Sequence, residues 1–190
     1  MERDQMIESV KAQMPEKRWK HTEGVMATAV QLAVRFGENP EQAELAAILH
    51  DVAKYWPVDR MEKVLRDQQL APELLDQDKN LWHAEVGAWV AEHEYGVTDT
   101  LVLDAIRFHT SGRLAMTRLD KVVCLADYME PGRDFPGVDD IRRLSKESLE
   151  QALLAGFDST ILLLLKKGKA IFPLTIDARN GLIEELKTGG

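Results

Sequence analysis

The chain has a single cysteine and no long apolar run. One cysteine, Cys124, cannot form an internal disulfide, which is typical of proteins in a reducing compartment. A membrane-spanning helix needs about 18 consecutive apolar residues, and this sequence has no such run. The polar start, residues 1–6, lacks the charged and then apolar layout of a signal peptide. We therefore expect a cytoplasmic protein with no membrane partner.

Positive charge is also scarce. Asp and Glu outnumber Lys and Arg by 32 to 24, which gives a net charge of −8. The overall field repels polyanions, and the basic stripe of a duplex-binding domain is absent. We therefore expect no nucleic-acid partner. A small phosphorylated ligand stays compatible with this charge, because a few converging Lys and Arg side chains suffice to bind it.

The sequence lacks the two-residue alternation that predicts β-sheets, and nearly every segment has the helical period instead. A chain of 190 residues with 45% apolar residues can bury one sizeable core. We therefore expect a single all-α domain, a helical bundle over residues 1–190. The expected helices are 3–13, 17–36, 40–51, 59–69, 81–95, 99–109, 119–128, 148–167 and 177–187.

Two helix boundaries have clear local signals. Gly37 is expected to end one helix, and Asn39 and Pro40 to cap and start the next. Thr98 is the expected cap of the helix that carries His109. Residues 131–137 and 168–175 are expected to be loops or connectors.

Four of the five histidines lie on, or at the edge of, the apolar stripe of an expected helix. They are His21, His50, His83 and His109. A lone histidine in such a place is most often a core residue hydrogen-bonded to backbone, because unpaired polar groups are costly there. Four of them, together with Asp51 and Asp127, instead indicate a shared divalent cation, since imidazole and carboxylate are suitable ligands. His93, among acidic neighbours, is expected at the surface.

The adjacent pair His50-Asp51 imposes a geometric condition. Neighbouring residues point about 100° apart on a helix, so the two can share one metal only near a helix end. The following Tyr55-Trp56-Pro57 indicates such an end. Asp51 is then also able to bridge to a second cation or to orient a water.

The order of these residues resembles the HD-domain superfamily of metal-dependent phosphohydrolases. Two longer motifs closely resemble the YqeK family within it, the bacterial symmetrical diadenosine tetraphosphate hydrolases. The motifs are His50-Asp-Val-Ala-Lys54 and Asp127-Tyr-Met-Glu-Pro-Gly-Arg133. Residues 172–180 resemble the C-terminal signature of the family, so the resemblance extends from Arg18 to Asn180.

The resemblance implies a metal centre with four ligands and two further histidines beside them. The implied metal ligands are His21, His50, Asp51 and Asp127. Iron is the implied metal, with cobalt or manganese as alternatives. His83 and His109 have two alternative roles: they bind a second metal through Asp51, or they contact phosphate and stabilise or protonate the leaving oxygen.

Further residues are implied to bind the substrate. Lys54, with Asp51, His83 and His109, is counted among the catalytic residues, and it is expected to reach phosphate as a point charge. Arg18, Thr110 and Arg133 are expected to contact phosphate as well, although Lys54 and Arg133 taken alone could equally be surface residues. The connector Ala170, Ile171, Phe172, Pro173, Leu174 and Thr175 is implied to contact a nucleoside.

The implied activity is symmetrical hydrolysis of diadenosine tetraphosphate to two ADP, by attack of metal-bound hydroxide on an inner phosphorus. The alternatives are another HD-domain phosphohydrolase (a nucleotidase or a deoxynucleoside-triphosphate triphosphohydrolase), a non-catalytic nucleotide sensor and a helical di-iron redox protein. The expected partners are a dinucleoside polyphosphate substrate and the product ADP. A homodimer is the candidate assembly.

Overall fold

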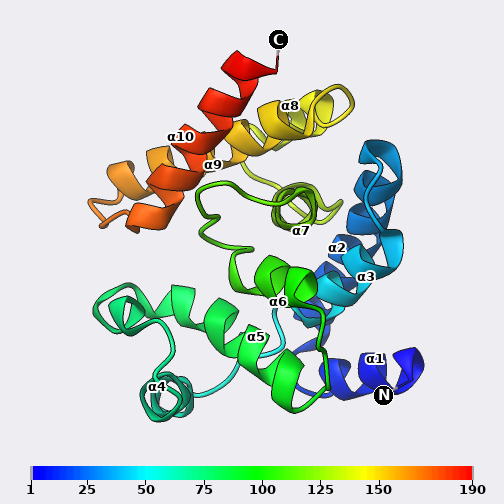
Figure 1. The fold of residues 1–190 in the computed structure, drawn as a ribbon, viewed down its shortest axis with the longest axis vertical. Coiled ribbons are helices and arrows are strands. Elements are labelled where there is room, and N and C mark those ends of the chain that lie inside the picture. The colour runs from blue at the N-terminus through cyan, green and yellow to red at the C-terminus, as the bar shows by residue number, and fades with distance from the viewer. Residues whose placement is uncertain (1, 190) are drawn as a thin grey trace.

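The computed structural model describes residues 2–189, which form ten α-helices and two 3₁₀ helices and contain no β-strand. The expected all-α class is confirmed. Among these residues, no helix combines the length and the apolar character needed to cross a membrane. The α-helices are α1 (Arg3–Lys11), α2 (Glu16–Phe36), α3 (Pro40–Leu49), α4 (Val58–Asp67), α5 (Trp82–His93), α6 (Thr100–Arg107), α7 (Arg118–Met129), α8 (Val138–Leu144), α9 (Leu149–Lys166) and α10 (Pro173–Thr188) (Figure 1). The 3₁₀ helices η1 (Pro72–Asp76) and η2 (Lys79–Leu81) connect α4 to α5.

The turn between α2 and α3 forms as its residues predict. Gly37 ends α2 with a φ of 68°, a left-handed conformation that glycine adopts without a steric penalty. Asn39 caps α3, because its side chain accepts hydrogen bonds from the backbone N–H groups of Glu41 and Gln42 at 2.9 and 3.3 Å. Pro40 occupies the first turn of α3.

The short turn makes α2 and α3 antiparallel neighbours that pack closely. Both helices contribute small, fully buried side chains to the core, which allows two helix axes to approach. They are Ala29, Ala33, Ala43, Ala46 and Ala47. As a result, the end of α3, with His50, lies beside the first turns of α2, with His21.

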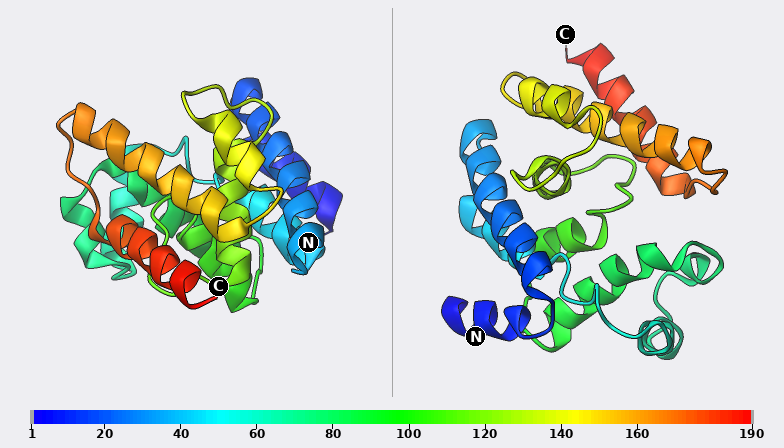
Figure 2. Two further views of the ribbon diagram at one scale, coloured as in Figure 1. Left: turned by 90° about the horizontal axis from the view of Figure 1, so that it is seen from above. Right: turned by 180° about the vertical axis from the view of Figure 1, so that it is seen from behind.

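Helix α7 lies at the centre of the molecule. It is seen end-on in Figure 1, with α9 above it and α6 below it, and Figure 2 shows α2 along its side. It packs against α2, α3, α6, α8 and α9, and every residue from 119 to 126 is buried. Asp127 follows this buried stretch directly, so its position is determined by helices on several sides.

The sequence predicted no element for residues 138–147, and helix α8 lies there. Its seven residues have little intrinsic helical stability. Tertiary hydrogen bonds provide it instead: the guanidinium of Arg142 donates to the carbonyl oxygens of Met129, Glu130 and Arg133 at 3.1, 2.9 and 2.8 Å.

Three other boundaries differ from the prediction. Helix α10 begins at Pro173 and not at 177, because proline is well suited to the first helical turn. The cap of α6 is Asp99 and not Thr98, since the Asp99 carboxylate accepts the Leu101 N–H at 2.9 Å. Helix α6 ends at Arg107, so His109 lies in the loop that follows it.

Candidate metal centre

The structure brings the six candidate histidine and aspartate side chains into one buried region. They come from α2 (His21), the end of α3 and the turn after it (His50, Asp51), α5 (His83), the loop after α6 (His109) and α7 (Asp127). His50 is the C-terminal cap of α3, so the pair His50-Asp51 lies at a helix end, as the geometric condition requires.

Three of these residues form one group of potential ligand atoms, and Asp127 adjoins the group through His21. His50 Nε2 lies 3.1 Å from Asp51 Oδ2, and His21 Nε2 lies 3.8 Å from the same oxygen. Asp127 Oδ1 lies 3.0 Å from His21 Nε2. The ligand atoms of His21, His50 and Asp51 are all within 4.8 Å of one another. One cation can therefore be in reach of these three residues, whereas Asp127 satisfies the distance condition for His21 alone.

The buried atoms of this group fit a divalent cation. Within residues 2–189, His21 Nε2, His50 Nε2 and both carboxylate oxygens of Asp51 are buried and make no regular hydrogen bond, and Arg18 is in ion-pair contact with one of the two oxygens. Leaving such atoms unpaired costs on the order of 1–3 kcal/mol each. Because they converge and because their chemistry is imidazole nitrogen and carboxylate oxygen, a borderline divalent metal would satisfy them together.

A second group of ligand atoms lies on the other oxygen of Asp51. His83 Nε2 and His109 Nε2 are 3.2 and 3.9 Å from Asp51 Oδ1, and they are 3.2 Å from each other. These three residues also satisfy the distance condition for a shared cation. Asp51 thus stands between two histidine pairs, and each of its oxygens faces one pair.

Backbone carbonyl groups orient three of the four histidines. In each case Nδ1 lies 2.6–2.7 Å from a carbonyl oxygen three residues earlier. The pairs are His50 with Ala47, His83 with Asn80 and His109 with Ile106. A carbonyl oxygen can only accept, so Nδ1 carries the proton and Nε2 keeps a free lone pair directed at Asp51.

The fourth histidine is oriented by a side chain that the sequence analysis did not single out. His21 Nδ1 donates to Glu130 Oε1 at 3.0 Å, and Glu130 Oε2 accepts the backbone N–H of Gly132 at 2.6 Å. A Cβ at Gly24 would lie only 2.5 Å from Glu130 Oε2, so glycine there leaves room for the carboxylate. Glu130 was part of the Asp127–Arg133 motif, but nothing in its spacing indicated a contact with α2.

Burial keeps the imidazoles of His50, His83 and His109 neutral. Burial, together with the nearby Lys54 ammonium, lowers the pKa of His83 to about 3. Burial, with the His83 ring, lowers the pKa of His109 to about 3 as well. The pKa of His50 is well below its ordinary value for the same reason. Neutral imidazole is the state that binds a metal.

Three cationic side chains surround the carboxylates. The Arg18 guanidinium pairs with Asp51, and the Arg133 guanidinium pairs with Asp127 and donates to its carbonyl oxygen at 2.7 Å. The Lys54 ammonium lies 3.4 Å from His83 Nδ1. Burial and the charge of Arg18 lower the pKa of Lys54 to about 8. All three predicted phosphate-binding cations therefore lie at the site.

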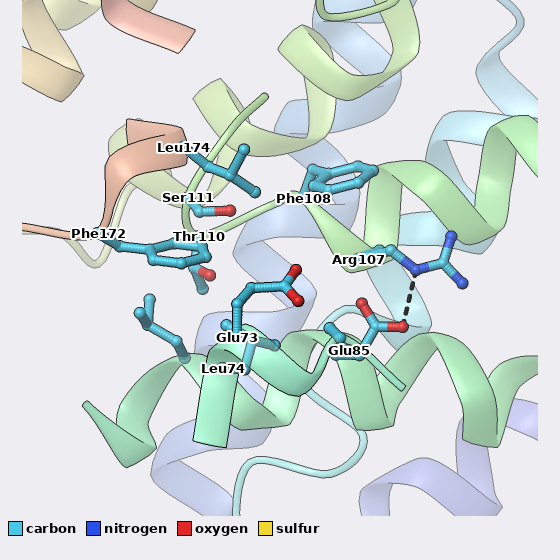
Figure 3. A pocket seen from close by; sticks show the side chains of 11 residues that line it. Glu73, Leu74, Glu85, Arg107, Phe108, Thr110, Ser111, Phe172 and Leu174 are labelled. Atoms are coloured by element: carbon cyan, nitrogen blue, oxygen red, sulfur yellow. Dashed lines mark hydrogen bonds and ion pairs between the residues drawn. The ribbon is translucent and has the colours of Figure 1, made fainter. Parts of the chain in front are cut away.

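A cavity of about 200 Å³ lies beside this site (Figure 3). Thr110, with a predicted phosphate contact, and Phe172 and Leu174, from the predicted nucleoside-contacting connector, line it. Its other lining residues were not anticipated from the sequence, because they lie on separate elements with no shared motif. They include Glu73, Glu85, Arg107, Phe108 and Ser111, and Figure 3 shows the ion pair of 3.0 Å between Arg107 and Glu85 at its edge.

The rest of the connector 170–175 does not line this cavity. Ala170 and Pro173 are exposed, and Ile171 is half-buried. Thr175 is buried in the first turn of α10, where its N–H donates to the Phe172 carbonyl at 2.9 Å. Only two of the six side chains in this segment therefore reach the cavity.

Comparison with known proteins gives consistent matches. A protein-family model described as HD domain matches residues 18–132, a range that includes every candidate ligand. The symmetrical bis(5'-nucleosyl)-tetraphosphatase of Bacillus subtilis is 46% identical, over 96% of this chain and 98% of that protein. Its namesake in Halalkalibacterium halodurans is 42% identical, over 98% and 100%. A Clostridium acetobutylicum crystal structure, described as a predicted HD superfamily hydrolase involved in NAD metabolism, is 39% identical with a TM-score of 0.93, over 97% and 98%.

Proposed function

Because this chain belongs to the HD-domain family and, within it, to the YqeK family of symmetrical bis(5'-nucleosyl)-tetraphosphatases, we propose that it hydrolyses diadenosine tetraphosphate symmetrically to two ADP. The observation that carries the proposal is the convergence of buried ligand atoms of His21, His50 and Asp51 beside three cationic side chains. This combination suits a substrate whose reacting part is a chain of phosphates.

His21, His50, Asp51 and Asp127 would hold the divalent cation, with iron as the proposed metal and cobalt or manganese as alternatives. The mixed nitrogen and oxygen donor set supports this choice over magnesium, which prefers oxygen ligands. When bound, such a cation lowers the pKa of a coordinated water and offsets phosphoryl charge. The backbone carbonyl of Ala47 and the Glu130 carboxylate would keep the two imidazoles in the metal-binding tautomer.

Arg18, Lys54 and Arg133 would bind the phosphate chain. Arg18 and Arg133 now pair with the carboxylates of Asp51 and Asp127, so entry of a phosphate would let their guanidinium groups exchange a carboxylate oxygen for a phosphate oxygen. The Lys54 ammonium would add a compact positive charge next to His83. The three cations would favour the transition state, in which charge develops on the leaving oxygen.

His83 and His109 keep two candidate roles. The free Nε2 atoms on Asp51 Oδ1 support ligation of a second cation. A role as donors to the leaving phosphate oxygen requires a proton on Nε2, which the negative charge of a bound phosphate would favour by raising the pKa. The number of metal ions per chain distinguishes the two roles, since the first needs two and the second needs one.

The cavity lined by Thr110, Phe172 and Leu174 would accept one adenosine. The Phe172 ring and the Leu174 side chain supply apolar contact for a base, and the hydroxyl groups of Thr110 and Ser111 supply polar contacts. We propose that Ala170, Ile171, Pro173 and Thr175 contribute through backbone groups only. Their side chains do not line the cavity, which supports this restriction.

The domain, location and assembly also belong to the proposal. One cluster of buried residues runs from Met6 to Leu182, which supports a single HD-type domain over residues 1–190. The net charge of −8 supports a small-molecule partner and no nucleic acid. A cytoplasmic location and a homodimer stay predictions, and fractionation and sedimentation would test them.

The test of the proposed function starts from anaerobically purified protein of known metal content. Asp51→Ala should abolish release of ADP from diadenosine tetraphosphate while circular dichroism keeps the helical signal, because Asp51 touches both ligand groups. The products also distinguish the enzymatic alternatives on one chromatogram. The proposed activity releases ADP, a nucleotidase releases nucleoside and phosphate, and a triphosphohydrolase releases nucleoside and triphosphate. Binding of the dinucleotide without turnover by the iron(II) form would favour the sensor. Full activity of metal-free Asp51→Ala would reject the proposal.

A further inference from the structure

A second, larger cavity of about 630 Å³ lies on the other side of the loop that carries His109 and Thr110. Thr110 lines both cavities, so the two adjoin at this residue. The inner end of the second cavity is formed by His109, Asp127 and Arg133, which belong to the candidate metal centre. The second cavity is therefore continuous with the reacting groups.

The outer part of this cavity has the character of a nucleoside site. The loop after α7 contributes the Phe135 ring, and α9 contributes Leu162 and Leu163. Leu162 is 56% exposed and Leu163 is 50% exposed, so apolar contact surface is available to a ligand. Lys166 at the end of α9 and Arg133 near the loop add two positive charges.

The proposed substrate requires such a second site. A dinucleoside tetraphosphate cut at its centre has one nucleoside diphosphate on each side of the reacting phosphorus. The first cavity, at about 200 Å³, is the smaller of the two, and the proposed function places one adenosine in it. The other half must extend in another direction, and the second cavity opens from the same centre.

Resting on the proposed function, we propose that the second cavity binds the second nucleoside diphosphate of the substrate, with its base against Phe135, Leu162 and Leu163 and its phosphates near Arg133 and Lys166. In this arrangement the two cavities hold the two products of one turnover. Selection of a dinucleotide over a mononucleotide then comes from apolar contacts on α9, outside the metal centre.

The test compares two leucines of the same helix. Leu163 lines the cavity, whereas Leu165, at 60% exposure, does not. Leu163→Gln and Leu165→Gln make the same neutral change at exposed helical positions, so both should keep the fold. Each variant is assayed with diadenosine tetraphosphate and with adenosine 5'-tetraphosphate, which has a single nucleoside that can use the first cavity.

We expect Leu163→Gln to lower kcat/KM for diadenosine tetraphosphate about five- to tenfold, because a contact with the second base is lost. The value for adenosine 5'-tetraphosphate should change by less than about twofold, and Leu165→Gln should change neither. Equal losses on both substrates, or no loss, would overturn the inference. A change in oligomeric state in Leu163→Gln alone would also overturn it, since the second cavity would then be an interface between copies of the chain. Wild-type protein that releases no ADP would instead refute the proposed function itself.

Discussion

His21 differs from the other three histidines of the centre in what orients its ring. Backbone carbonyl oxygens of the local turn hold His50, His83 and His109, and these cannot be removed by a side-chain substitution. The His21 ring depends on Glu130, which lies on the far side of the α2–α7 contact. At the scale of single residues, a substitution of Glu130 can therefore change the orientation of the proposed ligand His21 without replacing His21 itself.

Replacing Glu130 should weaken metal binding. Glu130→Leu removes the acceptor for His21 Nδ1, so the ring loses its fixed tautomer, and we expect about 10- to 100-fold weaker binding of iron(II) or cobalt(II). Glu130→Gln keeps an acceptor oxygen and should retain part of the affinity. Competition with a chromophoric chelator measures the dissociation constants independently of activity. Unchanged affinity in Glu130→Leu, with a wild-type melting profile, would contradict this role.

Lys54 should limit activity at alkaline pH. Burial and the charge of Arg18 lower its pKa from the ordinary 10.5 to about 8, so the ammonium is charged below pH 8 and neutral above it. If the charged form binds phosphate, kcat/KM of wild-type protein should fall as pH rises through about 8. Lys54→Arg keeps its charge in that range and should remove the decline. Identical pH profiles for both proteins would exclude Lys54 as the source of the decline in kcat/KM.

At the scale of elements, the loop after α6 is fitted closely beneath the C-terminal helices. Gly112 in this loop has a φ of 64°, and a Cβ there would lie 2.6 Å from Ala178 of α10 and from Phe157 of α9. The same loop carries His109 and Thr110. The contact of the loop with α9 and α10 thus sets where two site residues lie.

Gly112→Ala should therefore destabilise the protein by about 2–4 kcal/mol, from left-handed strain and overpacking together. Gly37→Ala is the matched control, because Gly37 has a similar φ of 68° but nothing within 4 Å of its Cβ position. Only the conformational cost of about 1 kcal/mol applies there. Urea unfolding of both variants gives the comparison, and equal losses would show that packing at Gly112 contributes nothing.

The sequence predicted an element well where neighbouring residues stabilise it, and poorly where contacts with other parts of the chain do so. The start of α3 could be predicted, because Asn39 and Pro40 act within a few residues. Helix α8 could not, since Arg142 stabilises it through carbonyl groups that precede the helix in the chain. The apolar positions of the histidines predicted that they converge, and the resemblance supplied the proposed ligand set, whereas neither indicated Glu130. Its partner His21 is on another helix, and an acidic residue in a Pro-Gly loop carries no periodic signal.

At the scale of the whole molecule, buried neutral imidazoles connect folding to pH. His83 and His109, each with a pKa of about 3, and His50, with a lowered pKa, remain unprotonated in the folded protein. In the unfolded chain they titrate near pH 6.5. Below that pH the unfolded state binds more protons than the folded state, so stability must fall as pH falls from about 6.5 toward 3.

Metal-free protein should show this loss directly. Each of the three histidines should lower the free energy of unfolding by on the order of 1 kcal/mol for every pH unit below about 6.5. Calorimetric melting at pH 7.5 and at pH 5.5 measures the change, and His109→Gln should reduce it because one titrating group is gone. A melting temperature that is the same at both values would show that these rings are not neutral and enclosed.

The wide separation of the proposed ligands His21, His50 and Asp127 along the chain has a consequence for how the protein would acquire a divalent metal. A nascent polypeptide offers no preassembled chelate, because the last donor is synthesised long after the first. Loading must follow tertiary assembly, and the enclosed donors then impede release of whatever ion entered first. Metal content should therefore record the ions available to the cell at the time of synthesis, and growth in cobalt-supplemented medium should yield a cobalt-filled enzyme that exchanges slowly afterwards.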